Sequence, residues 1–280
     1  MILEIGIWHR LKRSKLALTG AIIILLLIVI AVFAPLLAPY DPIRINLAER
    51  LQGPNIRHLF GTDNVGRDIL SRTLYGTRIS LAVGFAATFF SMSIGLVFGT
   101  LAGFFGGKID AVIMRFVDLM LSFPGLLLAI GIAVSLGPGL FTLFIALGCV
   151  GWAGFARLVR GIVLSIMQEP YIEAARAIGC GRLRIIIKHL LPNCLPLVIV
   201  TASLKIATFV LSEAGLSFLG LGAQPPTPSW GSMVSLGRDF IRTAPYMSVF
   251  PGLAIAITVI GFNLLGDGLR DLLDPKLNYF

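Results

Sequence analysis

"EPYIEAARAIGCGRLRIIIKHLLPN", residues 169–193, is a polar interruption between two long apolar runs. It combines acids and several Arg and Lys with a glycine break and a closing Leu-Pro-Asn. Glu169-Pro170 is typical of a helix start, because an acid is stabilised at the positive end of a helix and proline is tolerated in the first turn. Gly179 is typical of a helix end, because glycine adopts the left-handed conformation without a Cβ penalty. The stretch therefore predicts two short helices joined at Gly179.

The second of these helices is expected to be amphipathic. Four apolar residues recur at helical spacing and should share one face: Leu183, Ile186, Ile187 and Leu190. Arg184 and Lys188 share a different face, and Pro192 is expected to end the helix. Such an element could lie in the lipid interface, form a structural elbow between two spans, or dock onto a soluble partner. Composition alone favours the first of these roles.

The composition of the whole chain is that of a membrane protein. Of its 280 residues, 56% are hydrophobic and only 13% are charged, which favours one polytopic membrane domain over a soluble one. The net charge is +9, but no long basic stripe with interleaved aromatics lies outside the apolar runs, so nucleic-acid binding is not expected. Cys149, Cys180 and Cys194 lack disulfide or metal-site spacing and are expected to be free thiols.

Six apolar segments are long enough to cross a hydrocarbon core of about 30 Å as helices. They are Leu16–Ala38, Ile79–Gly106, Ala111–Leu136, Leu140–Ile166, Leu195–Phe218 and Met247–Leu269. The first exceeds the apolar core of a signal peptide, so we expect it to be retained as a helix. Six crossings place both termini on one side. The lysines outside the spans then fall on that side, which favours cytoplasmic termini: Lys12, Lys15, Lys108, Lys188 and Lys276.

The second span carries a ladder of small residues. Ser91, Gly95, Gly99, Gly103 and Gly107 are each four residues apart and therefore share one helix face. Small residues on one face allow another helix to approach closely, so the ladder predicts tight helix packing. A substrate path along this face is the alternative.

Polar residues within the spans are candidates for a translocation path. Lys205 lies near the middle of the fifth span, where a charge costs about 3 kcal/mol. It could mark a polar cavity or an ion pair, or it could snorkel toward an interface. Asn263 lies in the last span. Arg115 and Asp118, three residues apart in the third span, could pair across one helical turn.

Motifs that would indicate an enzyme are absent from the sequence. "GTDNVGRD", residues 61–68, has the glycine spacing of a phosphate loop, but Arg67 and Asp68 stand where Lys and Ser or Thr are needed. A turn-rich loop is the better interpretation. The three histidines His9, His58 and His189 lie on separate segments, and carboxylates with acid–base spacing are not found. We therefore expect a non-catalytic chain with no metal site.

Residues 173–192 resemble a signature of a known family. Glu173-Ala174-Ala175, followed by Gly179 and then by Leu191-Pro192, resembles the EAA signature of permease subunits of bacterial ABC importers. His189 occupies a position where that signature usually has Ile. Four further stretches look like the C-type permease subunit of the dipeptide, oligopeptide and nickel transporters: 58–84, 114–130, 211–233 and 250–277.

The resemblance implies an all-α type I ABC importer transmembrane domain with six spans, in a bacterial or archaeal cytoplasmic membrane. The implied division of the chain is a cytoplasmic N-terminus at 1–15, an extra transmembrane helix at 16–38, an external loop at 39–78, an importer core at 79–272 and a cytoplasmic C-terminus at 273–280. The core would include a cytoplasmic coupling loop at 167–193. The external loop Gly215–Tyr246 would lie near the outer gate or a binding protein.

The resemblance also implies the partners of the chain. These would be a B-type permease subunit, two ATPase subunits, an external solute-binding protein and the surrounding membrane lipid. The ATPases would bind ATP and Mg, and this chain would hold no cofactor. Residues 173–175 would face the ATPase contact, Gly179 would set the turn that aims the first helix, and Leu191-Pro192 would complete the signature.

Peptides, as di- or oligopeptides, are the expected substrates, with nickel or another small solute as the alternative for the same architecture. A secondary transporter driven by an ion gradient is the alternative from another class. Such a transporter would want internal repeats and paired acids within its spans, and the sequence shows no clear repeat.

Overall fold

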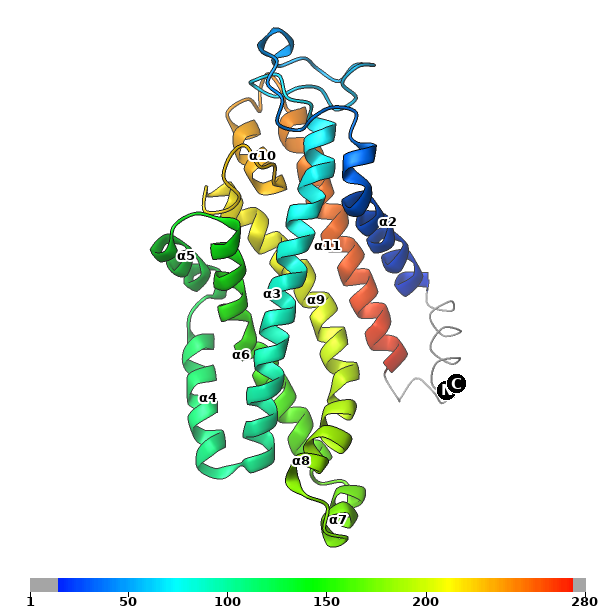
Figure 1. Ribbon diagram of the computed structural model, residues 1–280, viewed down its shortest axis with the longest axis vertical. Coiled ribbons are helices and arrows are strands. Elements are labelled where there is room, and N and C mark those ends of the chain that lie inside the picture. Colours follow the sequence, from blue (N-terminus) through cyan, green and yellow to red (C-terminus); the bar gives the residue numbers. More distant parts are fainter. Residues whose placement is uncertain (1–14, 274–280) are drawn as a thin grey trace.

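The computed structural model describes residues 15–273, which form an elongated, mainly helical bundle (Figure 1). Within this range, five helical segments are long and apolar enough to span a membrane. They are α2 (Lys15–Leu37), α3 (Ile69–Phe105), α6 (Leu140–Ile166), the continuous segment Arg182–Phe218 and α11 (Tyr246–Leu273). The predicted all-helical membrane fold is confirmed.

The third predicted span, Ala111–Leu136, is not one straight helix. It consists of α4 (Gly107–Ser122) and α5 (Gly125–Leu136), which meet at an angle of 89°. Phe123 has an extended backbone because the ring of the following Pro124 disfavours the helical conformation before it. Helix α5 therefore projects sideways from the bundle (Figure 1). The prediction of a continuous span was wrong here, and residues 15–273 contain six candidate spans only if the bent pair counts as one.

Helix α3 begins earlier than the span predicted at Ile79–Gly106. The Asp68 carboxylate accepts a hydrogen bond from the Ser71 N–H at 2.7 Å and so caps the helix, which starts at Ile69. The beginning of α3 thus lies inside the segment that was expected to be loop. The rest of that segment is irregular apart from the short helix η1 (Leu47–Glu49).

The ladder of small residues packs α3 against α6. The Ser91 hydroxyl donates to the Gly148 carbonyl at 3.0 Å. A Cβ built at Gly95 would lie 2.3 Å from the Cβ of Phe155, and Gly99 and Gly103 are equally crowded by α6. Tight packing is therefore confirmed for these residues, and α6 fills the face that was the alternative substrate path. Gly107 does not join the contact, because it begins α4 at φ +54° in open space.

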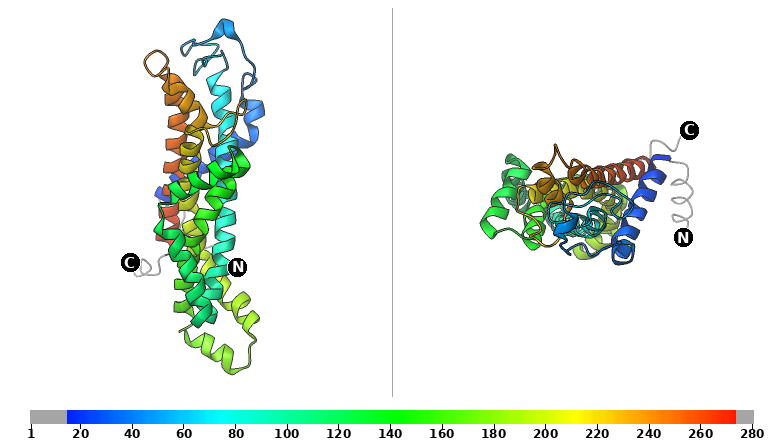
Figure 2. Two further views of the ribbon diagram at one scale, coloured as in Figure 1. Left: turned by 90° about the vertical axis from the view of Figure 1, so that its left-hand side faces the viewer. Right: turned by 90° about the horizontal axis from the view of Figure 1, so that it is seen from above.

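Helix α2 packs along the edge of the bundle, chiefly on α11 (Figure 2). This contact too depends on small residues. A Cβ at Gly20 would lie 2.4 Å from the backbone nitrogen of Leu265, and a Cβ at Gly268 would lie 2.4 Å from the Cβ of Ala17. The first predicted span is thus a packed helix of the fold.

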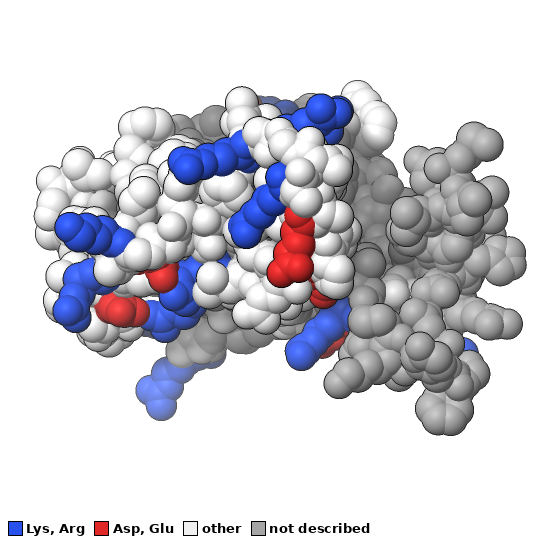
Figure 3. Space-filling view, turned by 90° about the horizontal axis from the view of Figure 1, so that it is seen from below, with Lys and Arg blue, Asp and Glu red and all other residues white. Residues whose placement is uncertain are grey.

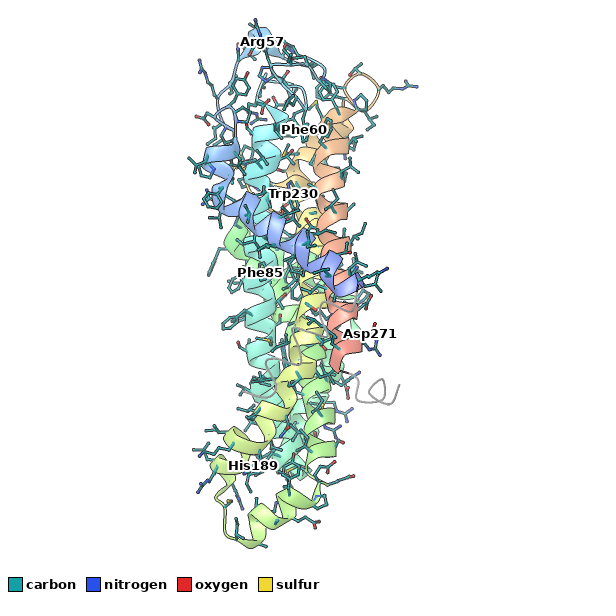
Figure 4. All side chains as sticks on the ribbon, turned by 90° about the vertical axis from the view of Figure 1, so that its right-hand side faces the viewer. Arg57, Phe60, Phe85, His189, Trp230 and Asp271 are labelled. Carbon is teal, nitrogen blue, oxygen red and sulfur yellow. The ribbon has the colours of Figure 1, made fainter. Side chains whose placement is uncertain are left out.

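The segment Gly215–Tyr246 is not only loop, as was expected. Helix α9 (Leu191–Phe218) reaches into it, and α10 (Trp230–Arg238) forms within it. The Trp230 ring is fully buried inside the bundle, and its Nε1 donates to the Thr73 carbonyl at 2.9 Å (Figure 4). This anchor holds α10 against α3, at the same end of the molecule as residues 38–68 (Figure 1).

Candidate functional site

The stretch 169–190, here called the elbow, lies at the end of the molecule opposite to residues 38–68 (Figure 1). It contains α7 (Pro170–Ala177), α8 (Arg182–Ile185) and the π-helical turn η2 (Ile186–Leu190). Helix α7 extends beyond the ends of the long helices, and His189 lies at the same end (Figure 4). As predicted, Pro170 occupies the first turn of a helix that starts after Glu169.

Gly179 forms the joint of the elbow, as the sequence predicted. Its φ of +80° is in the left-handed region. The Gly179 N–H donates to the Arg176 carbonyl, and the Cys180 N–H donates to the Ala175 carbonyl, each at 3.0 Å. This pair of bonds is the Schellman motif, which ends a helix by satisfying its last carbonyls. The direction of α7 relative to α8 is therefore set at one residue.

Pro192 does not end the second helix, and that prediction was wrong. The chain stays helical from Arg182 to Phe218. A proline deprives the carbonyl four residues earlier of its donor and crowds it. That carbonyl belongs to Lys188, which lies in the π-helical turn. In this turn the Leu191 N–H donates to the Ile186 carbonyl, five residues earlier. The wider turn accommodates the ring of Pro192 without breaking the helix.

The π-helical turn also changes which residues of the second helix are buried. The predicted apolar face was only partly right, since Leu190 is buried but Leu183 and Ile187 are 70% and 52% exposed. Ile185, which was not on the predicted face, is buried. The wider turn inserts an extra residue and so rotates the helix relative to a regular period of 3.6.

The outward surface of α7 differs from the expected contact of residues 173–175. Glu173 and Ala174 are exposed, but Ala175 is buried within the chain. Ile172 and Ala175, three residues apart, form the inward face of the helix. Ala175 therefore seats α7 on the rest of the protein, and Glu173 and Ala174 are available to a partner. Ile178, at the tip, is 81% exposed.

A hydrophobic cluster joins the elbow to the spans. The buried side chains come from the elbow, from α6 and from the start of α9: Phe155, Val159, Val163, Ile172, Ile185, Leu190, Cys194 and Val198. Beside Ile172, burial and then the charge of Glu169 raise the pKa of the Tyr171 phenol above its ordinary value. Because packed cores transmit displacement, a push on α7 would reach both spans.

Two ion pairs join α4 to α6 near the elbow end. Arg160 binds the Asp110 carboxylate with two N–H groups, one of them at 2.6 Å. Arg157 pairs with Asp118. The predicted pair between Arg115 and Asp118 is therefore wrong, because Asp118 finds its partner on the neighbouring helix.

The predicted path residues lie on two different helices. Lys205 is half-buried in α9, and no ion pair joins it to another residue in the range 15–273. Thr201, Thr208 and Ser212 share its face of the helix, none of them is buried, and each hydroxyl donates to the backbone of its own helix. Asn263 is exposed on α11. A role in a path remains a prediction for Lys205 and Asn263.

Two polar groups were missed by the sequence analysis. Glu213 is fully buried in α9 and accepts hydrogen bonds from the hydroxyls of Ser80 and Ser217, both at 2.7 Å. An acid within the apolar run Leu195–Phe218 was the available signal. In the opposite loop, His58 Nδ1 lies 2.9 Å from the buried Asp68 carboxylate. The three cysteines are free, as predicted.

Comparison with known proteins identifies the family. Residues 95–279 match the family described as "Binding-protein-dependent transport system inner membrane component". Residues 6–54 match the "N-terminal TM domain of oligopeptide transport permease C". The chain belongs to this family of importer permeases. The permease is therefore a multi-pass inner-membrane subunit, and the resemblance seen in the sequence is confirmed.

Relatives of this permease match almost its whole length. The dipeptide transport system permease protein DppC of Alkalihalophilus pseudofirmus is 50% identical over 270 residues, which cover 96% of this chain and 89% of the relative. The glutathione transport system permease protein GsiD of Escherichia coli is 47% identical over 271 residues, with the same coverage.

A solved structure of the MetNI methionine ABC transporter shares the fold of this permease. It matches with a TM-score of 0.58 and 24% identity, covering 73% of this chain and 96% of that chain. This likeness supports the predicted type I importer fold.

Proposed function

We propose that this permease and a second, B-type permease form the membrane path for di- or oligopeptides in an importer driven by two ATPase subunits. The full-length relatives named for dipeptide and glutathione transport support a peptide substrate. The single observation that carries the coupling role is the elbow, which presents an exposed short helix on a buried, rigid base.

The loop with phosphate-loop spacing, residues 61–68, is packed against a neighbouring segment of the chain. Gly66 has a φ of +78°, and a Cβ there would lie 1.8 Å from the Asn46 carbonyl oxygen, so the backbone at Gly66 packs directly against the segment that contains Asn46. It also lies at the end opposite to the elbow (Figure 1). In the proposed transporter, ATP and Mg would be bound by the partner ATPases, and this subunit would be non-catalytic.

In the proposed coupling, α7 sits in a cleft of an ATPase with Glu173 and Ala174 in the contact. Gly179 fixes the direction of α7, and the cluster around Ile172 passes its displacement to α6 and α9. Leu191 and Pro192 support this transfer because the helix is continuous through them. Closure of the ATPases would then rock the spans and open the path to alternate sides.

The polar face of α9 around Lys205 would line the path, facing the partner permease. A half-buried lysine that forms no ion pair with residues 15–273 is costly against lipid and acceptable beside a water-filled path. Asn263 of α11 is the second candidate. The external binding protein would approach the opposite end, where residues 38–68 and α10 lie (Figure 1), and both termini would be cytoplasmic.

Uptake into proteoliposomes that contain the complete transporter tests this function. We expect labelled di- or oligopeptides to accumulate only with ATP on the ATPase side and binding protein on the other. An uncoupler should leave the rate unchanged. Nickel salts serve as the substrate control. Accumulation driven by an ion gradient without ATP would contradict the proposal.

A further inference from the structure

An open cleft of about 540 Å³ lies between the end of α3 and the elbow. Six residues line it: Phe104, Phe105, Arg176, Cys180, Arg182 and Ile185. Phe104 and Phe105 are the last two residues of α3, and the other four residues come from α7, the Gly179 joint and α8. The cleft thus separates a membrane-spanning helix from the element that is proposed to receive the ATPase.

The cleft is cationic. It contains two arginines and no acidic residue. Arg176 donates only to the Met167 sulfur, at 3.5 Å, and within residues 15–273 neither Arg176 nor Arg182 is paired with a carboxylate. Seen from the elbow end, cationic side chains are spread over the surface and acidic ones are fewer (Figure 3). Two guanidinium groups that have no carboxylate partner in residues 15–273 fit a phosphate, because each presents a planar fork of N–H donors.

The position of the cleft indicates where that phosphate comes from. Phe104 and Phe105, the last two residues of the membrane-spanning helix α3, line the cleft, and this end of α3 lies near α8 (Figure 1). Phe105 is 43% exposed beside the cleft and stands edge-on to Phe104, with ring centroids 5.1 Å apart. An exposed apolar ring beside two arginines can pack against an acyl chain while the arginines contact its headgroup. The cleft therefore provides two arginines for a lipid headgroup and an apolar wall for the acyl chain attached to it.

We propose that this cleft binds the phosphate headgroup of an anionic phospholipid of the inner leaflet. The bound headgroup would hold Arg176 and Arg182 beside the end of α3 and so tie the elbow to the bundle. Through the proposed coupling role of the elbow, transport would then depend on the anionic lipid content of the membrane.

Cys180 provides a probe inside the cleft. The complete transporter, carrying Cys149→Ala and Cys194→Ala in this chain and no reactive thiol in its partners, is placed in vesicles of phosphatidylcholine with or without phosphatidylglycerol. We expect a water-soluble maleimide to alkylate Cys180 several-fold more slowly when phosphatidylglycerol is present. Each arginine contributes roughly fivefold to the affinity for anionic lipid.

The double variant Arg176→Gln, Arg182→Gln should lose this protection. The matched control Arg184→Gln, Lys188→Gln removes the same charge from exposed residues that do not line the cleft, and it should keep the protection. Equal protection of Cys180 in both double variants would overturn the proposal. So would inorganic phosphate slowing the alkylation of Cys180 in phosphatidylcholine vesicles as much as phosphatidylglycerol does. Because alkylation needs no transport, the result is independent of whether the proposed function holds.

Discussion

We expect Gly179→Pro to abolish ATP-driven uptake while the subunit still inserts into the membrane. Gly179 has a φ of +80°, whereas proline is fixed near −65°, so the joint between α7 and α8 cannot form. Proline also lacks the N–H that bonds the Arg176 carbonyl at 3.0 Å. The spans do not depend on this turn, because they pack through α3, α6, α9 and α11. Helix α7 would then no longer be directed toward the proposed ATPase contact.

Peptide uptake and ATP hydrolysis stimulated by the binding protein are measured together in proteoliposomes. Gly181→Pro is the matched control, since Gly181 has φ −65° and ψ 150°, a conformation that proline adopts readily. The control should retain both activities, and Gly179→Pro should lose both. Normal coupling in Gly179→Pro would show that the elbow does not dock as proposed.

We expect Gly95→Leu to prevent the permease from folding stably. The added Cβ would lie 2.3 Å from the Cβ of Phe155 and 2.9 Å from the backbone nitrogen of Ala156. Backbone atoms cannot yield as a flexible side chain can, so α3 and α6 must separate. Overpacking of this kind costs about 1–3 kcal/mol even at forgiving sites. The α3–α6 contact is the most extensive helix pair of the fold, so its loss should affect the whole bundle.

The measurement is the amount of folded permease in the membrane, together with its thermal unfolding in detergent. Gly161→Leu is the control, because Gly161 lies on the other helix of the pair and has open space around it. We expect the control to match the unchanged protein and Gly95→Leu to be largely degraded. Equal abundance and equal unfolding temperatures would show that the close approach of the two helices is not required.

The sequence predicted the features that depend on local chemistry. The apolar runs located the helices, the spacing of small residues located the α3–α6 contact, and Gly179 located the joint of the elbow. Each of these features requires a particular kind of residue at known positions: apolar residues in a span, small residues on a packed helix face, or glycine in a left-handed turn. The family resemblance supplied the partners and the proposed role, which no spacing of residues in this chain encodes.

The features that were missed depend on tertiary context. Pro124 breaks a helix whereas Pro192 is absorbed by a π-helical turn, and the sequence around each does not distinguish the two outcomes. Asp118 pairs with Arg157 because α4 lies against α6. The spacing of Arg115 and Asp118 along α4 carries no information about this neighbouring helix. The inward position of Ala175, by contrast, follows from its spacing of three residues from Ile172, whereas the family signature alone places Ala175 in the ATPase contact.

The most direct test of the account is where α7 makes contact. A photoactivatable amino acid is placed at position 174 of this chain in the complete transporter, and at position 56 as the control. Ala174 is exposed on the elbow, and Ile56 is 95% exposed in the opposite loop. The account predicts that illumination joins position 174, and not position 56, to an ATPase subunit. An assembled transporter in which position 174 forms no adduct with an ATPase would contradict it.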